Sequence, residues 1–340
     1  MPACATLAGT MSASALALVL VAAVLHATWN LWLKRAQADP ASLSWLTAAI
    51  GAVAYAPAAL LLHGDTLGGL SAAVWWSVLA SGVLHVAYFF ALQHGYRVGD
   101  LSVVYPVARG VGPMLSALVA IVWLGEPATV LSLLGLALIV AGTFTIAGGW
   151  AMVGRLWRAR GRGAGARVSA SAASGRAASP VPASAVPMPG ADPAATALDR
   201  VRAGLVWGAI TGVLIACYTV TDGRAVRVLG AAPLLFYWMS DAARAVLLTP
   251  AALVRRDRLK DTLRHSWRPV VGIALISPLG YILVLQAMTM APVSHVAPAR
   301  EVSMLIAAVL GARLLSEGEL ARRLAGAVLI VGGVVCLALA

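Results

Sequence analysis

The stretch LLGLALIVAGTF at residues 133–144 returns near the end of the chain as LAGAVLIVGGVV at residues 324–335. The offset of 191 between the two places Gly135 and Gly142 on Gly326 and Gly333. Glycines seven residues apart share one face of a helix, where the missing side chain lets a second helix approach closely. The match predicts a repeated unit whose last helix packs tightly against another helix.

The repeat extends over five apolar segments on each side. The offset of 191 also places Arg109 on Arg300 and Glu126 on Glu317. Nearby offsets relate further positions: Pro40, Trp45 and Pro57 to Pro233, Trp238 and Pro250, and Trp29 and Arg35 to Tyr218 and Arg224. Because five is an odd number, the second copy must enter a membrane with the opposite orientation. Inverted repeats of this kind are typical of secondary transporters, which bind substrate near the midplane between the halves.

The composition indicates a membrane protein. Hydrophobic residues make up 61% of the 340 residues and charged residues only 11%, whereas a soluble domain is about one quarter charged. Runs of about 20 apolar residues are long enough to cross the hydrocarbon core. The predicted fold is an all-α integral membrane protein with ten transmembrane helices in two inverted five-helix repeats. The predicted helices cover residues 12–33, 43–62, 72–93, 99–123, 128–149, 203–223, 232–253, 268–288, 292–313 and 322–339.

Two repeats and one connecting segment make up the predicted domains. The first five-helix repeat covers residues 12–149 and the second covers 203–339. Residues 150–202 are rich in Ala, Ser, Gly, Pro and Arg, a composition that cannot bury a core and predicts a disordered linker.

The distribution of basic residues predicts the orientation. Of the 25 Lys and Arg residues, twenty follow odd-numbered helices, two follow even-numbered helices and three lie inside the spans. Cytoplasmic loops are enriched in Lys and Arg. We therefore expect a multi-pass protein of a bacterial-type inner membrane, with the linker in the cytoplasm and both termini outside.

Two arginines lie inside predicted spans at equivalent positions of the repeat. An arginine at the bilayer centre costs roughly 2.5–3.5 kcal/mol on insertion scales, a cost tolerated when the side chain meets water, an anion or a buried partner. Arg109 and Arg300 could face one cavity and clamp a carboxylate or phosphate. Alternatively, each could form an ion pair with an acid on a neighbouring helix.

Three acids lie well inside the predicted spans. Asp241 is three residues before Arg244 on the same helix face, which indicates a local ion pair or, alternatively, a proton-coupling group. Glu301 is the second candidate for proton coupling. Asp222 lies near the end of its predicted helix beside Arg224, where we expect it to be solvated at the membrane interface.

Polar and aromatic residues at helical spacing are further candidates for a substrate cavity. They could line a wet cavity, or they could only form hydrogen bonds between helices. Together with the two arginines, the candidate substrate-binding residues are Tyr105, His26, Asn30, His85, Tyr88, Tyr281 and His295.

Prolines interrupt the fourth and ninth predicted helices at Pro106, Pro113, Pro292 and Pro298. A proline removes a backbone donor and clashes with the preceding turn, so each is predicted to kink its helix. Such kinks suit a cavity wall that bends, although a static kink would need the same residues.

The sequence lacks the motifs that are typical of ATP-binding, metal-binding and catalytic sites. Only two lysines occur, and neither follows a glycine-rich loop, so no P-loop for ATP is present. The three cysteines are scattered, and no spacing typical of a metal or catalytic site occurs. The sequence predicts no cofactor and no metal. The net charge of +12 is not interpreted as a sign of a nucleic-acid partner. The predicted partners are the lipid bilayer, a small-molecule substrate and protons as a candidate coupling ion. A membrane enzyme is the rival class, for which no paired acid and base is found.

Short motifs connect these features to a known family. YPVARG at 105–110, LGEP at 124–127, LHATWNLWLKRA at 25–36 and the glycine-spaced fifth and tenth helices resemble the EamA family of the drug/metabolite transporter superfamily. The resemblance covers about residues 15–147 and 204–338. It implies alternating-access transport, most simply export, of an amino-acid-like or organic-anion metabolite. Proton antiport or the substrate's own gradient would drive it. A multidrug or lipid-headgroup transporter of the same superfamily is the alternative. The second copy departs from the pattern because it reads HVAPAREV at 295–302, without the tyrosine and proline of the first.

Overall fold

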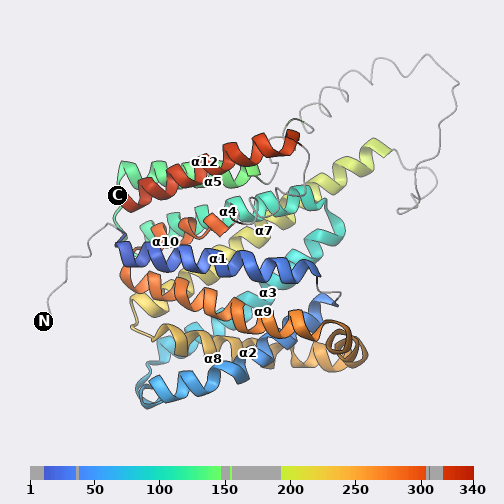
Figure 1. Cartoon of the computed structure of the whole chain (residues 1–340), viewed down its shortest axis with the longest axis vertical. Coiled ribbons are helices and arrows are strands. Elements are labelled where there is room, and N and C mark those ends of the chain that lie inside the picture. Colours follow the sequence, from blue (N-terminus) through green and yellow to red (C-terminus); the bar gives the residue numbers. More distant parts are fainter. Residues whose placement is uncertain (1–10, 36–37, 147–153, 155–192, 304–305, 307–316) are drawn as a thin grey trace, which may run out of the picture.

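The computed structural model describes residues 11–35, 38–146, 154, 193–303, 306 and 317–340, and within these ranges it contains helices and no strands. Figure 1 shows the helices side by side, with the start of α1 and the end of α12 at one end of the bundle, and the end of α5 and the start of α7 toward the other. We call these the terminus side and the linker side. The helices are α1 (Ala13–Arg35), α2 (Pro40–His63), α3 (Ala72–Val98), α4 (Leu101–Trp123), α5 (Val130–Ile146), α7 (Pro193–Arg227), α8 (Pro233–Val254), α9 (Arg256–Met290), α10 (Val293–Ala299) and α12 (Glu317–Leu339), with a 3₁₀ turn, η1 (Gly64–Gly69), after α2.

The helices have the length and surface of membrane spans. Five are long and apolar enough to cross a bilayer, and α1, α5 and α12 contain shorter apolar stretches. Large apolar side chains cover the outside of the bundle, including Leu61 at 85% and Val122 at 84% exposed. Such a surface would be unstable in water but matches lipid tails. The chain is therefore a multi-pass membrane protein. Much of the predicted ninth span, residues 292–313, lies outside the described residues, so the number of ten spans stays a prediction.

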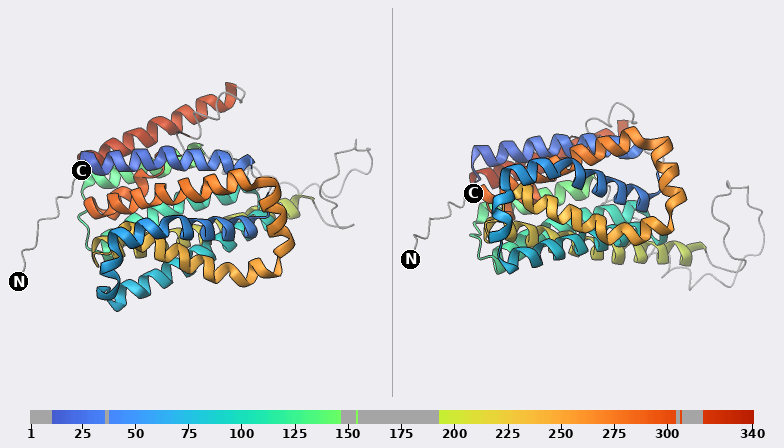
Figure 2. Two further views of the ribbon diagram at one scale, coloured as in Figure 1. Left: turned by 60° about the horizontal axis from the view of Figure 1, so that its bottom comes forward. Right: turned by 90° about the horizontal axis from the view of Figure 1, so that it is seen from below.

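The helix pairs follow the symmetry that the repeat predicts. In the repeat, α1, α2 and α3 are equivalent to α7, α8 and α9. Helix α1 packs on α9, and the equivalent pair α7 and α3 is also in contact; likewise, α2 packs on α9 and α8 packs on α3. Two further pairs, α2 with α8 and α5 with α12, join equivalent helices of the two copies. The parallel axes of the bundle are visible from two other directions in Figure 2. Core contacts are thus formed mainly between the halves, which places the centre of the molecule at the interface of the two repeats.

The glycine-faced helices α5 and α12 form one of these symmetric pairs. A methyl group added to Gly135 would lie 2.8 Å from the carbonyl oxygen of Gly333, and one added to Gly142 would lie 2.6 Å from that of Gly326. The pairing of the first glycine with the last shows that the helices run antiparallel. The predicted close packing at these glycines is confirmed.

Two helices begin earlier than the sequence predicts. Helix α7 starts at Pro193, so the end of the predicted linker is helical; the rest of the linker lies largely outside the described residues. Helix α9 starts at Arg256 and bends at Ser266, whose φ and ψ of −132° and 22° are not helical. The added basic segment, residues 256–266, is amphipathic: Leu259, Thr262 and Ser266 turn toward the protein while their charged neighbours face outward.

The proline-containing helices differ between the two copies. Helix α4 continues through Pro106 and Pro113. Helix α10 ends at Ala299, and Glu301 N–H then donates to Pro298 C=O at 2.9 Å, a tightened turn. Pro292 lies just before α10 as its N-cap residue. This corrects the predicted kink at Pro292, because a proline that precedes the first turn removes no helical hydrogen bond. The break at Arg300 and Glu301 puts two charged residues at an interruption of the helix.

Candidate substrate site

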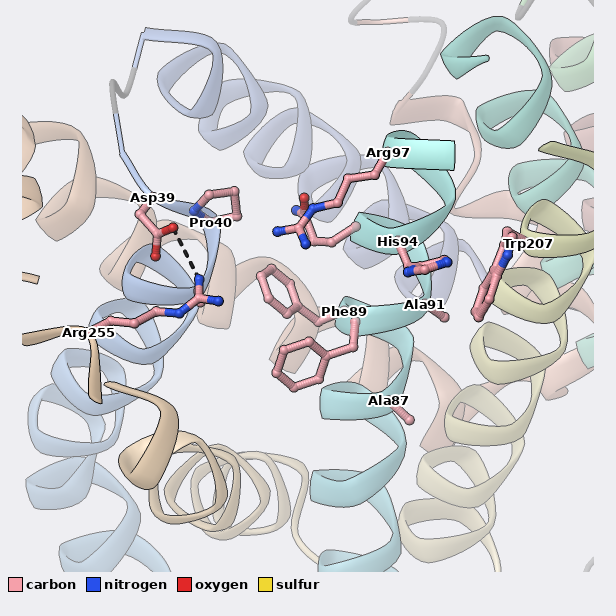
Figure 3. A pocket seen from close by; sticks show the side chains of 12 residues that line it. Asp39, Pro40, Ala87, Phe89, Ala91, His94, Arg97, Trp207 and Arg255 are labelled. Carbon is pink, nitrogen blue, oxygen red and sulfur yellow. Dashed lines mark hydrogen bonds and ion pairs between the residues drawn. The ribbon is translucent and has the colours of Figure 1, made fainter. Parts of the chain in front are cut away.

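A cavity of about 440 Å³ opens on the linker side among α2, α3, α7 and the junction of α8 with α9. We call it the vestibule. Figure 3 shows Arg97 of α3 and Arg255, between α8 and α9, reaching toward it, with Phe89 below Arg97 and His94 beside Trp207 at one edge. The ring centroids of His94 and Trp207 are 4.3 Å apart. The volume falls within the ~300–1,000 Å³ of small-molecule sites.

One wall of the vestibule is fixed by Asp39. Its carboxylate caps α2 by accepting from Ser42 N–H at 3.0 Å, and it forms an ion pair with Arg255 at 3.4 Å. The positive N-terminal end of a helix stabilises such a carboxylate. Arg97 has no ion pair with an acid of the described residues, so the vestibule carries an excess of positive charge.

An aromatic cluster lies deeper along α3. The His85 ring stacks on Tyr218 of α7 with centroids 4.1 Å apart, and Tyr88 meets the same tyrosine at 5.8 Å. Tyr281 of α9 approaches His85 at 6.0 Å. Ala87, on the turn between His85 and the outer part of α3, already lines the vestibule. The cluster therefore lies directly inward of the vestibule.

The two repeat-equivalent arginines are near each other but have different surroundings. Arg109 Nε lies 3.4 Å from Glu301 Oε2, and its guanidinium carbon lies 5.9 Å from the Tyr105 ring centroid. Arg300 is only 7% exposed, and no acid of the described chain lies within ion-pair distance of it. It lies within electrostatic range of Arg109, Glu301, Tyr218 and Tyr281. The buried carboxylate of Glu301 thus forms an ion pair with the half-buried Arg109 and lies within electrostatic range of the buried Arg300.

Arg244 donates to Asp241 across one turn of α8, so the predicted local ion pair is confirmed. The second oxygen of Asp241 faces Gly51 of α2, where a methyl group would come within 2.7 Å. The proton-coupling roles suggested for Asp241 and Glu301 stay predictions. Both carboxylates are held by an arginine in this structure.

The remaining predicted residues fall into two places. His26 contacts the Trp29 ring at a centroid distance of 4.8 Å and lies within electrostatic range of Arg109 and Arg300. His295 lies apart on the terminus side, 1% exposed. The side chain of Asn30 lies outside the described residues. The structure therefore brings together around the two arginines His26, His85, Tyr88, Tyr105 and Tyr281.

A buried polar contact joins α7, α10 and the corner after α4 on the terminus side. Glu126 accepts from Val293 N–H at 2.7 Å and from Ser294 N–H at 2.8 Å, and lies 3.8 Å from Arg227 Nε. The corner that carries Glu126 depends on Gly125, whose φ of 67° favours glycine. In this conformation the linker side has an open vestibule, and this contact holds the helices together at the opposite end.

We expect Glu126→Gln to destabilise the protein by about 3 kcal/mol, because it leaves Arg227 buried without its acid. The amide also presents only one acceptor oxygen to the two α10 N–H groups. Thermal unfolding of purified protein measures the effect. Asp65→Asn on the exposed η1 turn is the control, and equal melting temperatures for the two variants would contradict the assigned role.

Three residues of the site were not predicted as such. Tyr218 entered only through its repeat match to Trp29, and Glu126 only through its match to Glu317 and as part of the LGEP motif. Asp222 was expected at the interface, but it is 1% exposed and accepts from the Tyr281 hydroxyl at 2.7 Å. The expectation was wrong because α7 continues to Arg227, which places Asp222 more than one turn inside the helix. The spacing of four between Tyr218 and Asp222 was the signal, since it puts both on one helix face.

A repeated bundle of apolar helices, with a polar cluster beneath an open vestibule, defines a multi-pass membrane protein with a candidate binding site in its interior. The chain belongs to the EamA-like transporter family, whose model matches residues 13–148 and 202–339. A crystal structure of another protein is similar over 96% of each chain, with a TM-score of 0.63 and 18% identical residues, which shows a shared fold. No curated protein matches the chain.

Proposed function

We propose that the protein is a secondary transporter that moves a small metabolite across the inner membrane by alternating access. The substrate is an amino-acid-like molecule or another organic anion, and export is the direction that the family resemblance favours. The observation that carries the substrate class is the arrangement of Arg109, Arg300 and Glu301, in which one buried carboxylate faces two arginines. An unpaired guanidinium in a membrane interior is costly, and a substrate carboxylate would relieve that cost.

The proposed path runs from the vestibule past the aromatic cluster to Arg300. Arg97 and the aromatic lining would attract and hold the anion at the linker side, which we propose to be cytoplasmic because basic residues are concentrated there. The interruption of the helix places Arg300 at a turn rather than within a continuous helix. Release on the other side requires separation of the Glu126 contact, with both termini outside in this orientation.

The aromatic lining of the vestibule favours one alternative. Phe89, Phe90 and Trp207 would also suit a lipophilic drug or a lipid headgroup with its chain. Arg300 distinguishes the two functions, because a lipophilic cation would be repelled by an unpaired guanidinium, whereas an organic anion would be attracted.

Purified protein reconstituted in liposomes tests the proposal by counterflow of labelled substrates. The panel is the L-amino acids, C4 dicarboxylates and, for the alternative, tetraphenylphosphonium. We expect uptake of at least one anion or amino acid, and Arg109→Ala should abolish it. Uptake of the lipophilic cation alone would overturn the proposed substrate class.

Because Arg109→Ala leaves Glu301 buried without a partner, this variant needs a companion. Arg109→Ala combined with Glu301→Gln removes the stranded charge. If Arg109 contacts substrate, the double variant remains inactive although its folding recovers. If Arg109 only neutralises Glu301, the double variant regains transport. Arg268→Ala, on an exposed arginine stacked on Trp267 at 5.4 Å, is the control.

A further inference from the structure

Asp222 differs from the other buried acids of the described helices because no cation lies within ion-pair distance of it. Its side chain is 1% exposed. One oxygen accepts from the Tyr281 hydroxyl at 2.7 Å, and the other has no partner at hydrogen-bond geometry, although the Ser81 hydroxyl is close. Asp241 and Glu301, in contrast, are each held by an arginine. An isolated carboxylate is strongly disfavoured in an apolar interior, so a group in this position takes up a proton.

The unpartnered oxygen belongs to a carboxyl that lines a second, narrow cavity. Its volume is about 10 Å³, which is room for about one water molecule and too little for a metabolite. The size therefore favours a proton over a substrate group at this position. The polar and titratable groups facing Asp222 are Ser81 and His85 of α3, Tyr237, Ser240 and the Asp241–Arg244 pair of α8, Tyr281 of α9, and Arg300 after α10.

His85 of α3 lines this cavity together with Asp222. Its Nδ1 is 2.9 Å from the carbonyl oxygen of Ser81 and 3.3 Å from the Ser81 hydroxyl. Ala87 and Ala91, on the following turns of α3, line the vestibule itself. A path for water from the linker side would therefore pass His85 before it reached Asp222. Arg300 lies within electrostatic range of Asp222.

We propose that Asp222 is the residue that binds and releases the coupling proton of the transport cycle. This inference rests on the proposed function. A hydronium ion in the wet cavity gives its proton to the free carboxylate oxygen and leaves as water, and the reverse step returns the proton. Protonation makes the buried carboxyl neutral, so the helices can close around it. The substrate site can then switch its opening from one side of the membrane to the other. The ionised carboxyl forms where water reaches it. Proton binding and helix closure are linked in this way.

Infrared spectroscopy of reconstituted protein tests proton binding without a substrate. Between pH 5 and 9, the wild type should show the stretch of a protonated carboxyl that disappears on titration. Asp222→Asn should lose this band, Asp222→Glu should keep it at a shifted frequency and pH, and the exposed Asp65→Asn should match the wild type. A titrating band that survives in Asp222→Asn, or a wild type without any such band, overturns the proposal.

Transport measured with the panel above tests the coupling. An imposed pH gradient should drive accumulation by the wild type, and accumulation by Asp222→Asn should fall at least tenfold, with its remaining exchange independent of pH. Asp222→Glu should retain pH dependence, which a merely structural role would not predict. Gradient-driven accumulation by Asp222→Asn overturns the proposal. If the wild type transports nothing in the panel, the proposed function fails, and the infrared titration separately decides whether Asp222 binds a proton.

Discussion

Replacement of Arg300 by glutamine will lower transport of the anionic substrate about 100-fold. Arg300 is buried at a helix break and has no acid within ion-pair distance in the described chain. A bidentate guanidinium–carboxylate contact in such a site contributes about 3 kcal/mol, which corresponds to a factor of about 100. Glutamine has similar length but lacks both the charge and the fork of donors. Because Glu301 keeps its ion pair with Arg109, the removal of Arg300 should not leave that carboxylate without an arginine.

Counterflow in liposomes measures this effect, with the amount of folded, inserted protein matched by size-exclusion chromatography. Arg268→Gln, at an exposed position on the linker side, is the matched control and should transport as the wild type does. Arg300→Lys keeps the charge but not the fork, so we expect intermediate transport. Normal transport by Arg300→Gln would show that the substrate does not use this guanidinium, and the proposed anion site would have to be abandoned.

The repeat made much of the fold predictable. The match of residues 133–144 to 324–335 indicated two equivalent glycine faces, and the structure pairs those faces in antiparallel fashion. The two early helix starts were not predictable in the same way. Residues 193–202 and 256–266 are too polar to be recognised as helices by hydrophobicity, because that criterion detects only helix segments that lie within the bilayer. Basic, amphipathic turns at the membrane surface are stable for a different reason, because one face packs on protein while the other remains in water.

The candidate site was predicted in part, and there is a physical reason why the sequence did not predict the rest. Equivalent positions in the repeat correctly indicated that Arg109 and Arg300 come near each other, because inversion brings equivalent depths together. Sequence spacing also predicted the pairing of Asp241 with Arg244, since residues three apart meet on one helix. Partners on different helices leave no such signal. The contacts of Glu301 with Arg109 and of Asp222 with Tyr281 depend on helix rotation and depth, which only the packed structure defines.

Replacement of Gly333 by alanine will destabilise the protein, whereas the same replacement at the adjacent Gly332 will not. A methyl group at Gly333 would lie 2.6 Å from the Gly135 carbonyl oxygen and 2.6 Å from a side-chain carbon of Ile139. The nearest atom to a methyl group at Gly332 is 3.9 Å away. Overpacking of a close interface costs about 1–3 kcal/mol, and alanine at an unhindered helix position gains up to about 1 kcal/mol over glycine. Each variant adds one methyl group to the wild type, at adjacent positions, so the two variants have the same composition and hydrophobicity.

Thermal unfolding of both variants in detergent measures the difference. We expect a lower melting temperature for Gly333→Ala and an unchanged or slightly higher one for Gly332→Ala. Because Gly142 and Gly326 form the second close contact of α5 with α12, with a predicted methyl-to-carbonyl distance of 2.6 Å at Gly142, Gly142→Ala should resemble Gly333→Ala. Equal stability of Gly332→Ala and Gly333→Ala would contradict the tight antiparallel packing. A loss confined to the Gly333 and Gly142 variants would show that this symmetric contact between the two halves stabilises the fold.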